Sequence, residues 1–206
     1  MNQLQLATAS RWARRLALAL GGCLIVTAAA AQTATPAPTF GPPIAGACIL
    51  AKSEAIDRSQ AGVSANQQLT QFGQGIEVEL KGLRTAIEND DRALAGQKAS
   101  LSPVEFERRV AQLRQRYTDL THTQTVRAAQ LRLTTKDAIA QVTKIFELSV
   151  SDTITARHCS MVIERSVTYG SAEAMDITPV VTQKMDGIQS VVALRLATPE
   201  AAQAAH

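Results

Sequence analysis

A stretch of about 100 residues with a single proline constrains this chain more than any other feature. Between Ser53 and Val150 the only proline is Pro103, and it divides the stretch into two nearly equal halves. Each half repeats apolar residues at the steps of three and four that place side chains along one face of an α-helix. The sequence therefore predicts a long antiparallel helical hairpin over residues 53–150, with its turn just before Pro103.

Apolar side chains follow the helical repeat through both halves of this stretch. They lie at Leu69, Phe72, Ile76, Leu80, Leu83, Ile87 and Leu94 in the first half, and at Phe106, Val110, Leu113, Tyr117 and Leu120 in the second. After a polar stretch the second series resumes at Leu131, Ile139, Val142 and Ile145. Three glycines, Gly73, Gly75 and Gly82, interrupt the first series. Each glycine costs a helix about 1 kcal/mol relative to alanine. We therefore expect the first helix to be the softer of the two.

The start of the second helix carries a strong local signal. Ser102 is followed directly by Pro103, and Glu105 lies three positions after the serine. A serine can cap the first turn, a glutamate three residues later completes a capping box, and proline is favoured at the first helical position. The sequence predicts that the second helix begins here, and that Ser53 caps the first helix in the same way.

The first 31 residues predict an export signal. Three arginines precede an uncharged apolar run that ends in four alanines, which is the order of a secretory signal peptide. We assign residues 1–31 to this signal peptide and residues 32–43, rich in Pro, Ala and Thr, to a disordered linker. Cys23 lies in a sequence that loosely resembles a lipoprotein box, so a lipidated N-terminus at Cys23 is the alternative.

Two segments that flank the hairpin predict a β-rich oligomerisation body, formed by residues 44–52 and 151–196. Residues 44–50 and 159–167 are short runs rich in branched apolar side chains, which is typical of strands. Residues 167–169 are a further short strand candidate. The fold class expected is therefore α+β, with a helical arm that projects from a small sheet.

The C-terminal part of the chain predicts one more helix and a tail. Asp176 is a good N-cap, and Val181, Met185 and Ile188 would then lie on one face of the helix that follows. Alanines dominate residues 197–206, which we expect to be disordered.

Two cysteines remain once the signal peptide is set aside. Cys48 and Cys159 each lie in a predicted strand, one at each root of the hairpin. An antiparallel hairpin brings its roots together, and two nearby thiols can form a disulfide in an oxidising compartment. The sequence leaves two hypotheses open: a possible Cys48–Cys159 disulfide, or two thiols that are small buried apolar groups.

Charge is unevenly distributed along the predicted hairpin. Without the signal peptide the chain has 18 Lys and Arg and 18 Asp and Glu, so its formal charge is zero. Residues 53–91 carry a charge of −4, whereas residues 92–136 carry +6. Six cations near the turn form a predicted basic arm tip, which could attract acidic clients or anionic membrane surfaces: Arg92, Lys98, Arg108, Arg109, Arg114 and Arg116. The alternative is an ordinary solvated helix face.

Motifs for catalysis, cofactors and metals are missing from the sequence. It contains no phosphate-binding loop, no dinucleotide fingerprint and no nucleophile elbow. His122 and His158 have no Cys or carboxylate neighbours at metal-ligand spacing. Aromatic residues, which stack nucleic-acid bases, make up 3% of the chain. We therefore expect no enzyme activity, no cofactor, no metal and no nucleic-acid partner.

Two blocks of sequence flank the predicted hairpin. The first is Ile49-Leu50-Ala51 with Ser53 to Ile56 and Ser59-Gln60-Ala61-Gly62, and the second is Val162-Ile163 through Val167-Thr168-Tyr169 to Asp176-Ile177-Thr178-Pro179-Val180-Val181. With the order of the predicted parts, these blocks resemble the Skp/OmpH-like periplasmic chaperones. The resemblance covers roughly residues 44–190. The cysteines in the strands and the glycines in the first helix depart from the family pattern.

The resemblance implies a fold, a location and a function. It implies a periplasmic homotrimer whose three helical arms enclose a cavity. It also implies an ATP-independent holdase that binds unfolded outer-membrane proteins and prevents their aggregation. The rival hypothesis is an exported coiled-coil structural adaptor, or a lipid-anchored envelope spacer, without chaperone clients.

Overall fold

The computed structural model describes residues 38–204. The predicted signal peptide, Cys23 and residues 32–37 of the predicted linker lie outside the described residues. The chain divides after Pro38, and the unit from Thr39 onward contains every helix and strand of the described chain. Within residues 38–204 no helix combines the length and the apolar character needed to cross a membrane.

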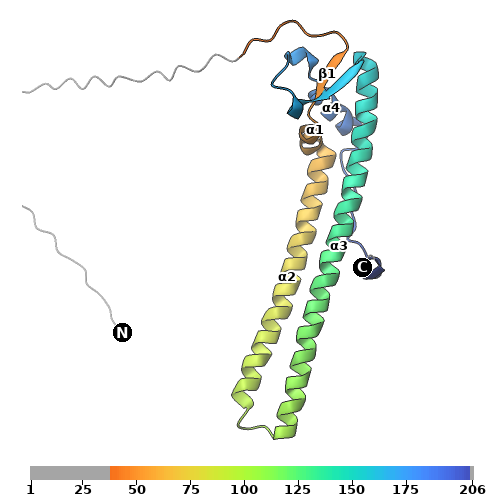
Figure 1. Cartoon of the computed structure of the whole chain (residues 1–206). Coiled ribbons are helices and arrows are strands. Elements are labelled where there is room, and N and C mark those ends of the chain that lie inside the picture. The colour runs from red at the N-terminus through yellow and green to blue at the C-terminus, as the bar shows by residue number, and fades with distance from the viewer. Residues whose placement is uncertain (1–37, 205–206) are drawn as a thin grey trace, which may run out of the picture. The chain divides into compact units, whose positions relative to one another are not determined.

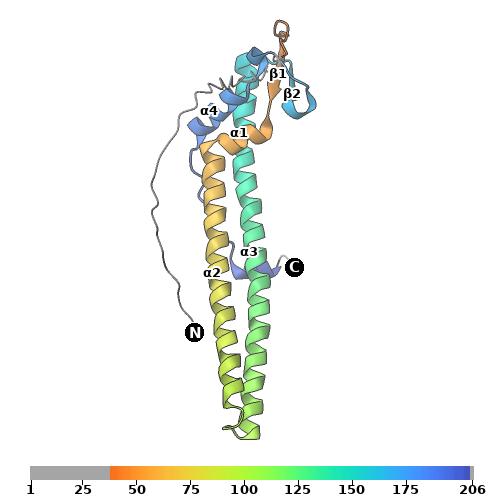
Figure 2. The ribbon, with the colours of Figure 1, turned by 90° about the vertical axis from the view of Figure 1, so that its left-hand side faces the viewer.

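Most of this unit is helical. Its elements in chain order are β1 (Ala47–Leu50), α1 (Lys52–Arg58), α2 (Gln60–Gln97), α3 (Pro103–Arg157), β2 (Met161–Glu164), the short 3₁₀ helices η1 (Arg165–Val167) and η2 (Glu173–Met175), α4 (Thr178–Ile188) and α5 (Pro199–Ala204). The predicted combination of long helices with a small sheet is confirmed. Figures 1 and 2 show α2 and α3 lying side by side, with β1, β2 and α4 gathered at one end.

The helix start predicted at Ser102 is confirmed. The Ser102 hydroxyl accepts a hydrogen bond from the backbone N–H of Glu105 at 3.2 Å, and Pro103 is the first residue of α3. At its other end α3 closes at His158, which has φ = 54°. Residues 151–157, assigned to the β-rich body from the sequence, are therefore the last turns of α3. The assignment was wrong because the helical repeat continues past residue 150.

The first helix begins one residue before Ser53 and is broken. Ala51, not Ser53, occupies the cap position of α1, and its N–H donates to the Thr178 hydroxyl at 2.9 Å. The break lies at Ser59, which is fully buried between α1 and α2. The Ser59 hydroxyl donates to the Ile56 carbonyl at 2.8 Å and accepts from the Gly62 N–H at 3.0 Å. One hydroxyl thus satisfies both helix ends at the break.

Gly62 is required by this break, unlike the glycines farther along α2. A Cβ atom at position 62 would collide with the backbone carbonyl of Ile56. At Gly73, Gly75 and Gly82 a Cβ atom would meet open space. The break at Ser59 therefore demands a glycine, whereas the other three weaken the helix without any steric need for them.

Substituting alanine at Gly62 and at Gly82 should change stability in opposite directions. We expect Gly62→Ala to lower the free energy of unfolding by about 1–3 kcal/mol, because backbone must move to admit the methyl group. Gly82→Ala should raise it by about 0.5–1 kcal/mol through helix propensity. Urea unfolding followed by circular dichroism measures both changes. Equal effects at the two positions would contradict the structure of the break.

The sheet has two parallel strands. β1 pairs with β2 in the register Ala47–Met161 through Leu50–Glu164. All four residues of β1 are buried, and the Ile49 carbonyl also accepts from the N–H of Ile177 at 2.9 Å. The strand predicted at residues 167–169 was wrong. The N–H of Thr168 donates to the Arg165 carbonyl at 3.0 Å, which closes a 3₁₀ turn, and Tyr169 is 99% exposed.

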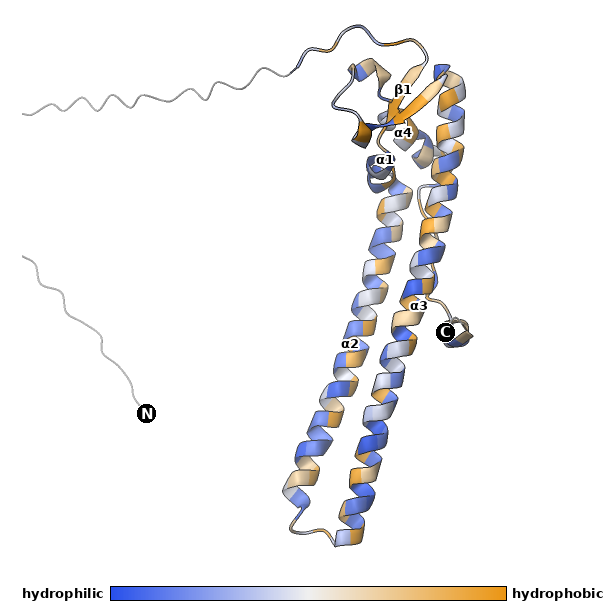
Figure 3. Cartoon of the chain, viewed as in Figure 1, coloured by the Kyte–Doolittle hydropathy of each residue, from blue (hydrophilic) through white to orange (hydrophobic). Residues whose placement is uncertain are grey.

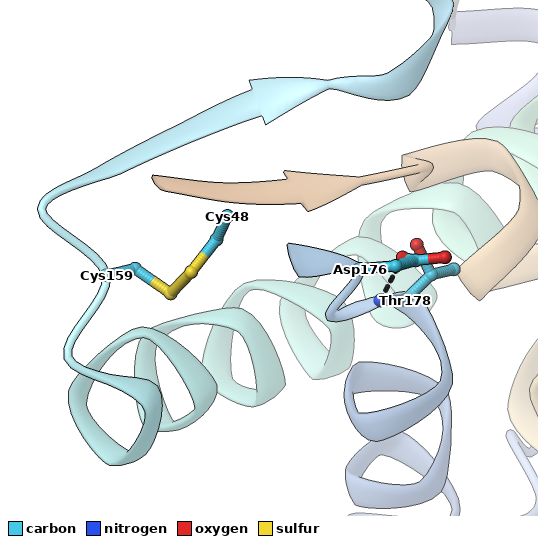
Figure 4. Close-up of a disulfide and its surroundings, with 4 residues drawn as sticks. All are labelled: Cys48, Cys159, Asp176 and Thr178. Atoms are coloured by element: carbon cyan, nitrogen blue, oxygen red, sulfur yellow. Dashed lines mark hydrogen bonds between the residues drawn. A yellow bond between two sulfur atoms is a disulfide. The ribbon is translucent and has the colours of Figure 1, made fainter. Parts of the chain in front are cut away.

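A disulfide joins the two predicted strand regions. Cys48 of β1 and Cys159, just before β2, are bonded, with their Cα atoms 5.8 Å apart. Figure 4 shows the bridge reaching Cys48 of β1, with β2 on one side of β1 and the Asp176–Thr178 turn on the side away from β2. The bridge spans 111 sequence positions and ties together the two ends of the helical hairpin.

Loss of the bridge should destabilise the protein. We expect the double variant Cys48→Ser/Cys159→Ser to lose about 2–4 kcal/mol in free energy of unfolding, because the cross-link restricts the unfolded chain. Urea unfolding with and without dithiothreitol is the measurement. Reductant should shift the wild-type midpoint to that of the variant and leave the variant unchanged. A wild-type midpoint insensitive to reductant, with two free thiols by mass spectrometry, would contradict the bridge.

The chain after α4 packs along the hairpin. Residues 189–198, here named the C-terminal strap, connect α4 to α5 and run beside α2 and α3 (Figures 1 and 2). Val192, Leu194 and Ala202 are buried. The prediction of a disordered tail over 197–206 was therefore wrong for residues 197–204. Polar side chains of α2 and α3 bind the strap backbone, and composition does not reveal such partners.

Candidate functional site

An apolar groove opens at the root of the hairpin, between α1, α2 and α3. Its volume is about 780 Å³. Its apolar lining includes Ile56, Val63, Leu69, Ile139 and Val142, from all three helices. Val63 is 42% exposed and Ile139 is 61% exposed, so branched side chains at the groove are open to contact from outside. We name this feature the root groove.

The distal part of the hairpin has a thin core. Between residues 73 and 128, the buried side chains are Ile87, Leu94 and Leu120. Figure 3 shows hydrophobic residues concentrated at the sheet and scattered sparsely along the far part of α2 and α3. Little apolar burial therefore stabilises this half of the arm, and local opening there needs less free energy than opening at the root.

Three polar contacts fix how α2 and α3 align. Glu79 pairs with Arg127 at 2.8 Å, Asp90 pairs with Arg116, and the Gln97 side chain accepts from Arg109 at 2.7 Å. Successive contacts are 11 and 7 residues apart on both helices. Both steps return to nearly the same side of a helix with 3.6 residues per turn. The three contacts therefore lie along one seam and set a single antiparallel register.

Charge exchange across this seam tests the register. Arg127→Glu places two like charges together and should lower the free energy of unfolding by about 0.5–1 kcal/mol, the range of exposed ion pairs. The double variant Glu79→Arg/Arg127→Glu should recover most of that loss. A double-mutant cycle in urea at low salt gives the coupling free energy. Strict additivity of the two single substitutions would contradict the pairing.

The predicted basic arm tip contains more internal pairing than its composition indicates. Arg108 and Arg109 both bind Glu105, at 2.8 Å, and Arg116 pairs with Asp90. Hydrogen bonds from Arg108, and secondly from Arg109, lower the pKa of the Glu105 carboxyl to about 2. Two carboxylates of the same hairpin, Glu105 and Asp90, thus offset two of the three positive charges of these arginines.

The remaining three cations of the tip form no ion pair among residues 38–204. Arg92 donates to the Asn89 side chain at 2.6 Å, and the Lys98 ammonium lies 5.8 Å from the centre of the Phe106 ring. Residues 88–116 together hold six basic and five acidic side chains. The hairpin places the acidic end of α2 beside the basic start of α3, which cancels most of the charge difference seen along the sequence.

A polar network joins the sheet to α1 and α4. Arg165 pairs with Glu54 at 2.7 Å and with Asp176, and also donates to the Thr178 hydroxyl at 3.2 Å. The Asp176 carboxylate accepts from the Thr178 N–H at 2.9 Å (Figure 4). Asp176 therefore holds the first turn of α4, although Ile177 is the cap residue. Sequence reasoning missed Arg165, which could have been suspected only from its place between Ile163 and Asp176, where the family resemblance is strongest.

The body carries exposed apolar side chains next to its small sheet. Met161 of β2 is 55% exposed, Val167 is 76% exposed and Tyr169 is 99% exposed. Ile44, just before β1, is 68% exposed. In the described part of the chain β2 pairs only with β1, so its other edge keeps free backbone groups. Apolar side chains and an open strand edge are both available for association.

Two comparisons relate this chain to known proteins. Residues 48–185 match the family described as outer membrane protein (OmpH-like), which is about two thirds of the chain. The chain belongs to the OmpH-like family. The matched residues run from β1 through the hairpin to α4, and the C-terminal strap lies beyond them. The resemblance drawn from the sequence is thereby confirmed.

A solved structure supports the fold of this OmpH-like chain. A crystal structure of a candidate outer membrane chaperone (OmpH-like) from Caulobacter crescentus CB15 superposes with a TM-score of 0.76. The two are 24% identical, and the alignment covers 79% of this chain and 96% of that one. At this identity the likeness shows the fold alone. A comparison with curated proteins gives no match.

Metal-ligand geometry is missing from the described part of the OmpH-like chain. Among residues 38–204, no three His, Cys, Asp or Glu side chains lie close enough together to hold a metal ion. Five features there can make contacts with other molecules: the root groove, the thin-cored arm, the arm tip, the exposed edge of β2 and the strap.

Proposed function

We propose that this protein is a periplasmic, ATP-independent holdase that binds unfolded outer-membrane proteins between helical arms and prevents their aggregation. The observation that carries the proposal is the root groove, an open apolar surface on an OmpH-like arm. Binding of exposed apolar segments requires no nucleotide and no chemical step. The name of the Caulobacter relative, a candidate outer membrane chaperone, is consistent with this role.

Three copies would assemble through the body. A two-stranded sheet is marginal by itself and usually needs further strands or a packed face. The open edge of β2, with Met161, Val167 and Tyr169 exposed beside it, supplies the surface for such contacts. In this proposal the bodies join as a homotrimer and the three arms project around a shared cavity.

Client contacts in the root groove would be weak and tolerant of sequence. Apolar contact is not directional, and full burial of one Val, Leu or Ile side chain contributes about 1.5–3 kcal/mol. Much of that is offset by the entropy lost when an unfolded chain is ordered. A groove that admits a few apolar side chains at a time therefore binds reversibly, as a holdase requires.

The middle of the arm is soft on both helices. By the register of the polar seam, Gly82 of α2 lies opposite residues 123–125 of α3. In that part of α3 the hydroxyls of Thr121, Thr123 and Thr125 donate to the carbonyl four residues earlier. Such bonds slightly weaken and bend helices. Soft segments that face each other allow the arms to open around clients of different sizes.

The arm tip contributes electrostatic attraction of limited range. Arg92, Lys98 and Arg114 are the tip cations without a carboxylate partner in the described residues. They would attract acidic clients or an anionic membrane surface over about 8–10 Å at physiological salt. Because residues 88–116 are close to neutral, this attraction would assist apolar binding and not replace it.

Dilution of an unfolded porin tests the holdase proposal. We expect the protein without its signal peptide to suppress light scattering when urea-unfolded porin is diluted, and to have the mass of a trimer in native mass spectrometry. Val63→Asp/Ile139→Asp should reduce suppression several-fold, because charges in the groove oppose apolar binding. Val78→Asp is the matched control, since Val78 is 72% exposed on α2 but does not line the root groove.

Two outcomes would count against the proposal. A stable trimer without effect on scattering would favour the coiled-coil adaptor or envelope spacer. Equal loss of suppression in the groove variant and in Val78→Asp would remove the root groove from the mechanism.

A further inference from the structure

The C-terminal strap has the burial pattern of a strand without belonging to a sheet. Val192 is fully buried and Leu194 is 7% exposed, whereas Val191, Ala193 and Arg195 between and beside them are exposed. A period of two is the pattern of an extended chain with one face covered. The covered face packs into the same apolar cluster as Ala65 and Ala138 at the root of the arm.

A glutamine side chain takes the place of a neighbouring strand. The Gln68 amide nitrogen donates to the Val192 carbonyl at 2.6 Å, and its oxygen accepts from the Leu194 N–H at 3.1 Å. In a parallel sheet one residue bonds to the carbonyl and the N–H of residues two apart in the same way. The Gln68 amide thus binds the strap as a peptide group of a partner strand would.

Two further side chains bind the strap backbone at Ala197. The Gln130 amide donates to the Ala197 carbonyl, and the Ala197 N–H donates to the Thr134 hydroxyl at 2.9 Å. Gln130 and Thr134 are each 2% exposed. Buried polar groups of this kind need partners, and the strap backbone provides them. Gln68, Gln130 and Thr134 all bond to main-chain atoms of the strap. These bonds do not select a sequence, so only the buried side chains of the strap can do so.

The strap site and the root groove lie on different flanks of the helix pair. Successive residues of an α-helix are turned by about 100°. On α2, Gln68 therefore projects away from Asn66 and Thr70, which line the root groove. On α3, Thr134 likewise projects away from Ile139 and Thr143. Ala65 and Ala138 line the groove and also belong to the apolar cluster that the strap covers, so they lie between the two flanks. One flank is open and the other is occupied by the strap.

We propose that the strap flank, formed by Gln68, Gln130 and Thr134, is a binding site for extended polypeptide segments with apolar residues at alternate positions, and that the strap occupies it as an internal competitor. The inference rests on the proposed holdase function and names the conformation of the client segment. Strands of outer-membrane barrels alternate apolar and polar residues, so their unfolded segments have the required pattern.

The way in which the strap is held is compatible with release. Among the described residues, the Val192 carbonyl, the Leu194 N–H and both backbone groups of Ala197 bond to side chains, not to a strand ladder. The strap ends at the short helix α5, near the end of the chain. A tethered segment competes at an effective concentration of about millimolar. A client segment can therefore displace it only if the strap's own contacts are weak.

Peptide binding to the full chain without its signal peptide tests this proposal. The probe is a fluorescein-labelled peptide with the sequence of residues 189–198. Val192→Asp/Leu194→Asp should release the strap and increase probe affinity at least 10-fold over wild type by fluorescence anisotropy. Val191→Asp/Ala193→Asp is the matched control, because these positions are exposed, and it should bind the probe as wild type does.

One further variant and one modified probe identify the contacts. Gln68→Ala, combined with Val192→Asp/Leu194→Asp, should lower probe affinity several-fold, because it removes both hydrogen bonds of the Gln68 side chain. A probe methylated on the nitrogen of its sixth residue, which corresponds to Leu194, lacks the N–H that Gln68 accepts and should bind correspondingly less well. Probe affinity that is unchanged by both the Gln68 substitution and the methylation would overturn the proposed site.

Folding and client assays complete the test. A released variant that loses its helical circular dichroism, or that keeps it without binding the probe, shows that the strap is a fixed structural part and overturns the proposal. Probe binding is measured without any client, so it does not depend on the porin assay. If the released variant binds the probe but wild type and variant both fail to suppress aggregation, the holdase function fails while the peptide site stands.

Discussion

The buried strand β1 holds together everything else in this protein. Its four residues are enclosed, and its backbone bonds to β2 on one side and to the start of α4 on the other. Those two segments follow the second arm helix, whereas β1 precedes the first. Because β1 leads into the first helix and bonds to segments that follow the second helix, the positions of both helices depend on it. A hairpin with so few buried apolar groups toward its tip could not keep its register if this root were loose.

Local signals in the sequence predicted the elements whose cause is local. The capping box at Ser102 and the apolar repeat required no knowledge of distant residues, and the start of α3 follows them. The break at Ser59 escaped prediction because no proline marks it, and the apolar repeat identified in the first helix begins only at Leu69. The sequence does not distinguish Gly62 from Gly82. Only the Ile56 carbonyl beside Gly62 shows that this position requires glycine, whereas Gly82 merely weakens its helix.

Features that depend on contacts between residues far apart in the sequence could not be predicted from local signals. The strap consists largely of small and branched residues, and this composition does not predict whether the segment is ordered. Its partners Gln68 and Gln130 lie far away in the sequence. The charge at the arm tip was misjudged for a related reason. Acidic and basic runs that are separate along the chain become neighbours once the register of α2 and α3 is set. The exposure of Ile139 likewise depends on how the helices pack. Its position fits the apolar repeat, which predicts burial, yet its side chain is exposed in the root groove.

The Cys48–Cys159 bridge makes the arm part of a covalently closed ring. Exposed turns are where proteases cut most readily, and the turn between α2 and α3 is the exposed end of this hairpin. A single cut there would leave both helices bonded to the body through the bridge and the sheet. A nicked chain would keep its mass on a non-reducing gel and separate into two fragments only on reduction. The arm can thus suffer one cleavage without the loss of either half.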